Sequence, residues 1–93
     1  MTRRHFDRDL MHMAAPSRVA NVTLGTLNAL QNWEPHEQVL GAAAVFLHLA
    51  DFWRVPAQDV FTAVTNLIND KDGKARPEFR AIRPYLDNEL GNK

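Results

Sequence analysis

A long apolar helix, a short break and a second helix are encoded in residues 34–69, EPHEQVLGAAAVFLHLADFWRVPAQDVFTAVTNLIN. Between Val39 and Ala50 only Gly41 and His48 interrupt the apolar residues, so a helix there is hydrophobic almost all the way round. Such a helix has to be surrounded by other protein. In a chain of 93 residues, the surrounding protein is a set of neighbouring helices, a second copy or a partner. The stretch therefore predicts an architecture and indicates assembly.

Two prolines divide this stretch into helices. Pro35 suits the first turn of a helix, where its missing N–H costs nothing, and Glu37 is favourable in the same turn. Val55 precedes Pro56, and a residue before proline is pushed out of the α region, so the first helix ends there. The small residues 41–44 allow another helix to approach the first one closely. Pro56 then opens the second helix, whose apolar stripe consists of Val60, Ala63, Val64, Leu67 and Ile68.

The residues before position 34 predict two further helices. A short amphipathic helix is expected from Arg3 to Met13. A longer one is expected to begin at Pro16 and to run to about Asn32. Gly25 lies inside the longer helix, where it costs roughly 1 kcal/mol relative to alanine. We therefore expect it to mark a close helix crossing.

The residues after position 69 predict an exposed connection and a last helix. Gly73 is the expected turn residue of the connection. The last helix is expected from Pro77 to Leu90, and Pro84 lies too deep for its first turn, so it should kink or split the helix. The predicted fold is an all-α, compact bundle of four to five short helices.

Composition restricts the class of protein. The formal net charge is zero, which argues against binding to a bulk polyanion, although residues 1–18 and 71–83 are basic and residues 19–70 acidic. There is no cysteine, so disulfides and cysteine-ligated zinc are excluded. No signal peptide or membrane-spanning run is recognisable, which favours a cytoplasmic protein without membrane contact.

The expected domain organisation is simple. Residues 1–93 form a single helical domain, in which residues 1–15 are an N-terminal helical arm and residues 16–93 the helical core.

The histidines suggest two kinds of site, and we favour the structural interpretation of both. His5, Asp9 and His12 have the spacing of metal ligands on one helix face, but a solvated polar face has the same pattern. His48 is either a general base or pH switch, or a core histidine that bonds a carbonyl or Asp51. No phosphate-binding loop, zincin motif or nucleophile elbow is present. We therefore predict a protein that is not an enzyme, with no catalytic residue, no metal site and no cofactor.

Two groups of side chains are candidates for contact with a partner. Trp33, Phe52 and Trp53 are aromatic residues of the kind that anchor interfaces, although they are equally common in a small core. The basic stretch 71–83 has two interpretations. It either contacts phosphate or an acidic protein, or it is an exposed loop and helix face that is solvated. Its candidate partner-binding residues are Arg76, Arg80 and Arg83.

Residues 49–60, LADFWRVPAQDV, resemble the helix-turn-helix pattern of DNA-binding regulators. The resemblance implies that the second helix enters the major groove with Gln58, Asp59 and Thr62 facing DNA and with Arg54 close by. Two features depart from the pattern: the turn has no glycine, and the second helix has no lysine or arginine. Since phosphate contacts normally dominate affinity, a two-helix hairpin of a bundle explains the pattern better.

Residues 77–90, PEFRAIRPYLDNEL, resemble the C-terminal ends of small, uncharacterised helical proteins encoded by bacteriophages. The shared elements are an acidic-Phe opening, an Ala-Ile step, an aromatic residue and a closing Asn-Glu-Leu. The resemblance implies a small accessory or host-takeover factor that acts by binding.

The size of the chain favours association. Ordering a chain costs about 1.5 kcal/mol per residue, and small cores barely offset that cost without disulfides or metals. The sequence therefore predicts a non-catalytic protein that acts by protein–protein interaction, forms a homodimer and has a host protein as a candidate partner. The alternative is a helix-turn-helix-like DNA-binding regulator that uses the 49–64 hairpin.

Overall fold

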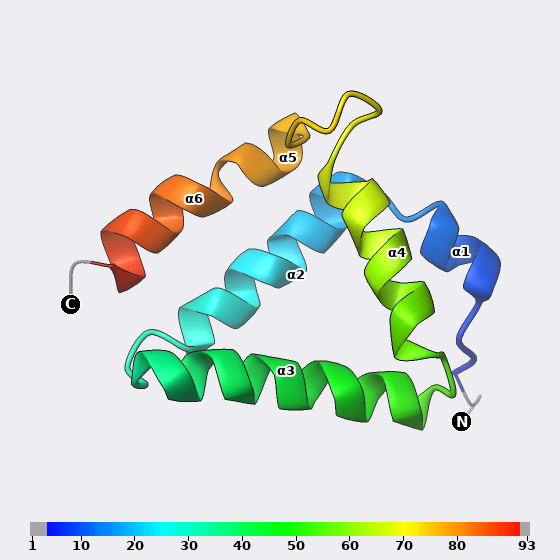
Figure 1. Cartoon of the computed structure of the whole chain (residues 1–93), viewed down its shortest axis with the longest axis horizontal. Helices are drawn as coiled ribbons and strands as arrows, with labels where there is room; N and C mark the ends of the chain where they lie inside the picture. The colour runs from blue at the N-terminus through cyan, green and yellow to red at the C-terminus, as the bar shows by residue number, and fades with distance from the viewer. Residues whose placement is uncertain (1–3, 92–93) are drawn as a thin grey trace.

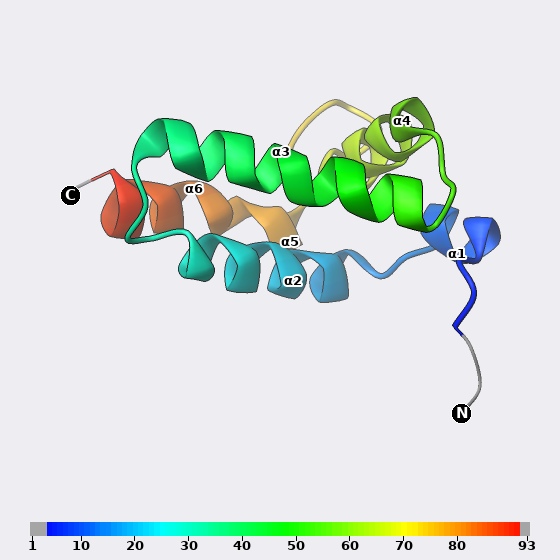
Figure 2. The same cartoon turned by 90° about the horizontal axis from the view of Figure 1, so that it is seen from below.

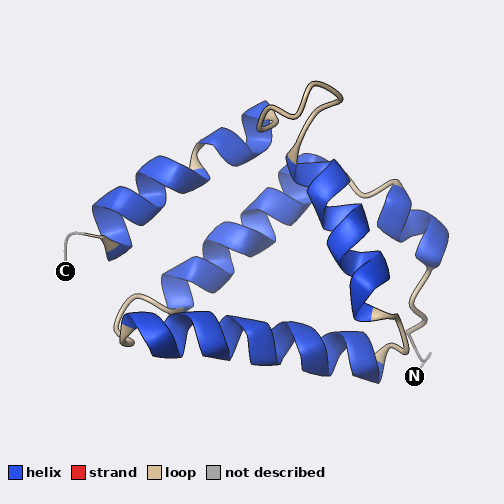
Figure 3. Cartoon of the chain, in the orientation of Figure 1, coloured by secondary structure: helices blue, strands red, loops and turns tan. Residues whose placement is uncertain are grey.

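The computed structural model describes residues 4–91, and most of these residues are helical (Figure 3). The predicted all-α compact bundle is confirmed, and no strand is present within the described residues. The last three elements follow one another without a loop and form one bent helical segment. The elements are α1 (Arg8–His12), α2 (Pro16–Ala29), α3 (Pro35–Phe52), α4 (Ala57–Ile68), α5 (Pro77–Arg80), α6 (Ile82–Tyr85) and the π-helical turn η1 (Leu86–Leu90).

The three long helices form the sides of a triangle (Figure 1). Two packing contacts organise the bundle: α3 packs on α4, and α5 packs on α2. Seen from below, α3 and α4 lie at one level and α2 at another (Figure 2). The segment from α5 to η1 runs beside α2, and α1 and η1 lie on opposite sides of the molecule (Figure 1).

The first turn of α3 forms as predicted. Pro35 occupies the first turn, and the Glu34 N–H donates to Glu37 Oε1 at 3.1 Å. This contact satisfies one of the backbone donors that a helix N-terminus leaves free.

The turn between α3 and α4 differs from the prediction in one detail. Trp53 caps α3, and the next residue, Arg54, has a positive φ of 58°. The Val55 N–H donates to the Ala50 carbonyl at 2.9 Å. These are features of a helix end that usually has glycine in the left-handed position. Pro56 does not open α4 but caps it, with an extended ψ of 130°. The extended conformation of Pro56 changes the direction of the backbone, so α4 begins only at the next residue.

Both N-terminal helices are shorter than predicted. α1 begins only at Arg8, because the Asp7 side chain accepts the N–H groups of Asp9 and Leu10 at 2.9 and 3.1 Å and so caps the helix there. The predicted start at Arg3 lies outside the described residues. α2 begins at Pro16 as predicted but ends at Ala29, not at about Asn32.

The early end of α2 has a physical cause. The chain must leave the helical conformation before Glu34, which precedes Pro35 and has an extended ψ of 150°. The Leu30 carbonyl at the end of α2 accepts the Gln38 side-chain amide at 2.8 Å.

The prediction that another helix crosses α2 closely at Gly25 is wrong. Among the described residues, no atom lies within 4 Å of the position that a Cβ on Gly25 would occupy. Besides the packing of α5 on α2, Tyr85 of α6 joins the C-terminal segment to the end of α2: its hydroxyl accepts from Gln31 at 2.9 Å and donates to Asn28 at 3.3 Å.

Two predictions for the C-terminal third are confirmed. Gly73 is the turn residue, with a positive φ of 78°, and the turn is stabilised by Asp70, whose Oδ1 accepts two backbone N–H groups. Pro84 divides the last helix, since α5 ends at Arg80 and α6 begins at Ile82. The physical reason is that Pro84 has no N–H to donate to the carbonyl four residues before it.

The core of the described chain is small. Only four hydrophobic residues are buried, namely Ala20, Ala50, Val55 and Phe79. One aromatic pair joins two helices: the rings of Phe46 on α3 and Phe61 on α4 are 5.0 Å apart at their centroids and tilted by 56°. Two of the four buried residues are alanines, so burial contributes little to stability compared with a well-filled core.

Candidate partner-binding surface

The most unusual surface of the molecule is the exposed apolar side of α3. We define the α3 surface as its six large apolar side chains that are more than half exposed. These are Val39, Leu40, Val45, Leu47, Leu49 and Phe52. Monomeric soluble proteins rarely expose a large contiguous apolar patch unless it serves an interaction.

This surface exists because α3 is apolar on all sides while its neighbours cover one side only. Ala50 is buried, and Gln38, Ala42 and Phe46 are half-buried on the covered side. No described atom lies within 4 Å of the position of a Cβ on Gly41. The small residues 41–44 predict the close approach of another helix. Within the described residues, no other helix approaches α3 closely at Gly41.

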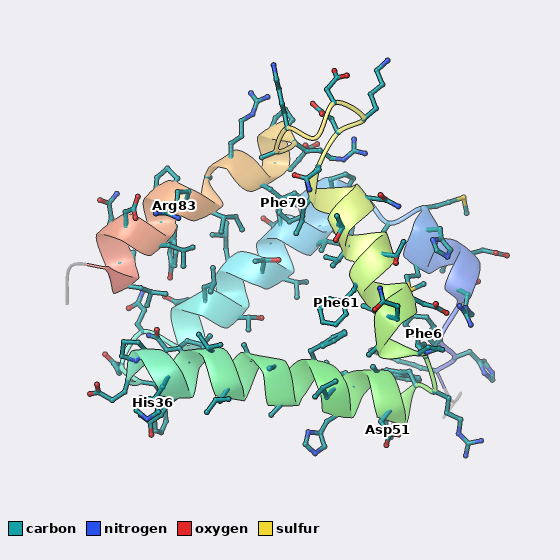
Figure 4. All side chains as sticks on the ribbon, viewed as in Figure 1. Phe6, His36, Asp51, Phe61, Phe79 and Arg83 are labelled. Carbon is teal, nitrogen blue, oxygen red and sulfur yellow. The ribbon has the colours of Figure 1, made fainter. Side chains whose placement is uncertain are left out.

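One line of residues along α3 points directly away from the other helices. Figure 4 labels His36 and Asp51, which extend outward from the two ends of α3. Leu40 lies one turn after His36 and Leu47 one turn before Asp51, so all four share one side of the helix. We call these four residues the outer stripe. Each is exposed, and the sequence analysis did not single them out as a group.

The three aromatic residues predicted to anchor a partner do not form one cluster. Phe52 and Trp53 make a T-shaped contact with ring centroids 4.9 Å apart. Trp33 lies before the other end of α3, about 27 Å away along a helix of 18 residues. Trp33 and Phe52 are 60% and 70% exposed, whereas Trp53 is half-buried.

The two ends of α3 also border cavities. Between α2 and α3 lies an apolar groove of about 340 Å³, lined by Leu30, Trp33 and Val45 among others. Near the other end, Trp53 lines a cavity of about 440 Å³ together with residues of α1 and α4. Trp33 therefore faces an open groove, while Trp53 faces the cavity bordered by α1 and α4.

The candidate DNA-binding residues are only partly available to a ligand. α3 and α4 meet at a bend of 116°, which falls within the range of helix-turn-helix units. However, Asp59 forms an ion pair with Arg8 of α1, and the Thr62 hydroxyl donates to the Gln58 carbonyl within α4. Arg54 lies at the turn, but α4 itself carries no lysine or arginine, and Arg8 beside it is paired with Asp59. The bend angle therefore fits the motif while the charge does not.

The candidate basic residues near the C-terminus make contacts within the chain. Arg76 donates to the Asn66 carbonyl at 3.2 Å, and Arg80 donates to the Ala75 carbonyl at 3.2 Å. Arg83 forms an exposed ion pair with Asp87 at 3.4 Å. Arg76 and Arg80 hold the 69–76 connection and the start of α5 in place, and Arg80 and Arg83 are exposed.

The histidines take structural positions. A His48 ring nitrogen lies 2.7 Å from the Ala44 carbonyl oxygen one turn earlier, so the expected carbonyl bond is present. The expected core position is wrong, because His48 is exposed. His5 precedes α1, so it does not continue a helix face with Asp9 and His12, and the described residues contain no group of three potential metal ligands.

Within residues 4–91, no single helix is long and apolar enough to cross a membrane. Only α3 and α4 together reach the required length and hydropathy, and they are separated by the 116° bend.

Comparison with protein-family models, with curated proteins and with solved structures gives no match. Function is therefore inferred from the surface itself.

Proposed function

We propose that this protein is a non-catalytic binding protein that acts through protein–protein interaction, with the α3 surface as its contact surface. The observation that carries the proposal is the exposure of six large apolar side chains on one helix. Burying such a side chain gains about 1.5–3 kcal/mol. A partner that covers several of them therefore gains enough free energy to offset much of the cost of association.

Two aromatic side chains are suited to be anchors of this contact. Trp33 and Phe52 are highly exposed and lie at opposite ends of α3. Aromatic residues often dominate the binding energy of an interface, because they bury a large area with few rotatable bonds. Trp53 supports the contact indirectly through its edge-on packing against Phe52.

Charged residues on the last helical segment are a separate candidate contact. Arg80 and Arg83 are exposed there, and Arg76 lies half-buried at its start. The segment runs beside α2 and not along α3 (Figure 1), so these cations would contact an acidic partner at a second place, where they mainly affect the rate of association. The resemblance to small phage-encoded proteins is consistent with a host protein as such a partner.

DNA binding remains the second candidate, supported by the bend between α3 and α4. It predicts retardation of DNA that weakens steeply as salt is raised, and its loss in the double variant Arg54→Ala, Gln58→Ala. Retardation that survives this double substitution would rule out the 49–64 hairpin as the contact.

The test of the main proposal combines two measurements on the purified chain. Light scattering across protein concentration reports association, and fluorescence of the dye 8-anilinonaphthalene-1-sulfonate reports exposed apolar surface. Either association, or a monomer whose dye binding falls when Val45 and Phe52 are changed to serine, supports α3 as a contact surface. A monomer that does not bind the dye contradicts the proposal, because α3 would then be covered by its own chain.

A further inference from the structure

The single chain exposes more surface than a folded monomer of its mass. Its accessible area is 7611 Å², whereas a monomer of 10.6 kDa is expected to expose about 5,500 Å². Even if the largest area that an average residue can expose, roughly 160 Å², is subtracted for each of the five residues outside 4–91, an excess of about 1,300 Å² remains. Stable interfaces bury about 800 Å² per partner, and obligate homodimers bury more. The excess therefore matches the area that one protomer of a tight homodimer buries.

The outer stripe is arranged so that it complements itself. About the peptide bond between Ala43 and Ala44, His36 is the mirror position of Asp51, and Leu40 is the mirror position of Leu47. A two-fold axis through this point, perpendicular to α3, places Leu40 of one copy against Leu47 of the other. The same axis places His36 against Asp51, and both ends of the stripe are exposed in the single chain.

The centre of the outer stripe also suits a two-fold axis. The residues there are Ala43 and Ala44, whose small side chains allow two helices to approach closely.

We propose that a second copy of this chain covers the outer stripe of α3, with the two α3 helices antiparallel across a two-fold axis between Ala43 and Ala44. The proposal rests on the proposed function and names its partner. An antiparallel arrangement also opposes the two helix dipoles. A parallel arrangement would instead place Asp51 against Asp51 and Leu40 against Leu40.

Cysteine cross-linking tests both the partner and the direction of pairing, because the chain has no cysteine of its own. The variants are Leu40→Cys and Leu47→Cys, each alone and mixed in equal amounts. In the antiparallel pair, equivalent residues at position 40 are about 10 Å apart along the helix axis alone, beyond the reach of about 7 Å for a disulfide. We expect a cross-linked dimer in the mixture and little in either variant alone. Cross-linking of each variant with itself would overturn the antiparallel arrangement.

A pair of charge substitutions tests the position of the interface. Leu40→Arg and Val22→Arg are matched, since these side chains are 67% and 68% exposed in the single chain and both lie inside helices. Leu40→Arg should weaken dimerisation by at least about 30-fold, as expected for a central contact, and Val22→Arg on α2 should not. Circular dichroism of both variants confirms that the helices are retained. A dimer lost with Val22→Arg but kept with Leu40→Arg would overturn the proposal.

The native chain distinguishes this inference from the proposed function. A monomer at all concentrations that binds the apolar dye through α3 would overturn the second copy as partner but would leave α3 as a contact surface for another protein. A monomer that does not bind the dye would overturn both.

Discussion

Two phenylalanines of this chain have opposite surroundings. Phe79 on α5 (Figure 4) is 7% exposed, at the contact of α5 with α2, whereas Phe52 at the end of α3 is 70% exposed. Both are in helices, and both are flanked by a charged residue and an aromatic or basic one. The difference comes from their neighbours: a second helix covers Phe79, and no described helix covers Phe52.

This comparison shows that the chain has one helix contact that buries its apolar side chains and one helix whose apolar side chains stay partly uncovered. The contact of α2 with α5 buries Ala20 and Phe79. The most apolar helix, α3, is covered on one side by α4 and is open on the other sides. Under our proposals, stability depends mainly on the first region and association mainly on the second.

The largest effect is expected from Phe79→Ala, which breaks the contact of α2 with α5. Removal of a buried phenylalanine typically costs about 3–5 kcal/mol, a large part of the stability of a small domain. Urea denaturation followed by circular dichroism measures the loss. Phe52→Ala is the matched control and, at a dilution where the chain is monomeric, should cost about 1 kcal/mol, through its edge contact with Trp53. Equal costs for the two substitutions would contradict the difference in packing.

Smaller gains are expected when the helix glycines are replaced by alanine. No described atom lies within 4 Å of a Cβ placed on Gly25 or Gly41, so each substitution should stabilise the chain by about 1 kcal/mol through helix propensity. Thermal melting of the two variants sharpens the comparison between α2 and α3. A gain for Gly25→Ala without a gain for Gly41→Ala would show that another molecule contacts α3 at position 41.

The turn after α3 offers a test of local strain. Arg54 has a left-handed backbone, which glycine adopts without steric cost. Arg54→Gly should therefore stabilise the single chain by about 0.5–1 kcal/mol, and the rise in Tm measures it. Arg54 lies outside the outer stripe, so the variant should associate as the native chain does. A fall in Tm would contradict the relief of strain.

The smallest effect is expected from the ion pair that joins α1 to α4. Arg8 and Asp59 are about half exposed, and such pairs contribute about 0.2–1 kcal/mol. Arg8→Ala should destabilise the chain by a few tenths of a kcal/mol at low salt, and the difference should fall as salt is raised. A loss above 1 kcal/mol that is independent of salt would show that α1 is held by apolar contacts instead.

Much of the fold followed from local chemistry in the sequence. Pro16 and Pro35 lie in the first turns of α2 and α3, Pro84 divides the last helix, and Gly73 turns the connection. Each depends on the backbone preferences of one residue. The predicted start of α1 was wrong because the Asp7 side chain caps the helix, which therefore begins at Arg8 and several residues later than its apolar pattern predicted.

The candidate surface could be predicted only in part. The apolar character of residues 39–50 indicated a helix that needs a surround, and the structure leaves one side of α3 uncovered. Which residues point outward required the three-dimensional positions of the neighbouring helices. The sequence grouped Trp33 with Phe52 and Trp53, whereas the length of α3 separates them.

The sequence by itself determined the helices, their breaks and the presence of one helix that is apolar on all sides. These properties depend on residue type and on the fixed period of the α-helix, which act over a few residues. Only the tertiary structure decided that α5 covers Phe79 and that the outer stripe of α3 stays open. Burial depends on how distant segments pack, and that packing follows from the summed contacts of the whole chain and not from any local pattern.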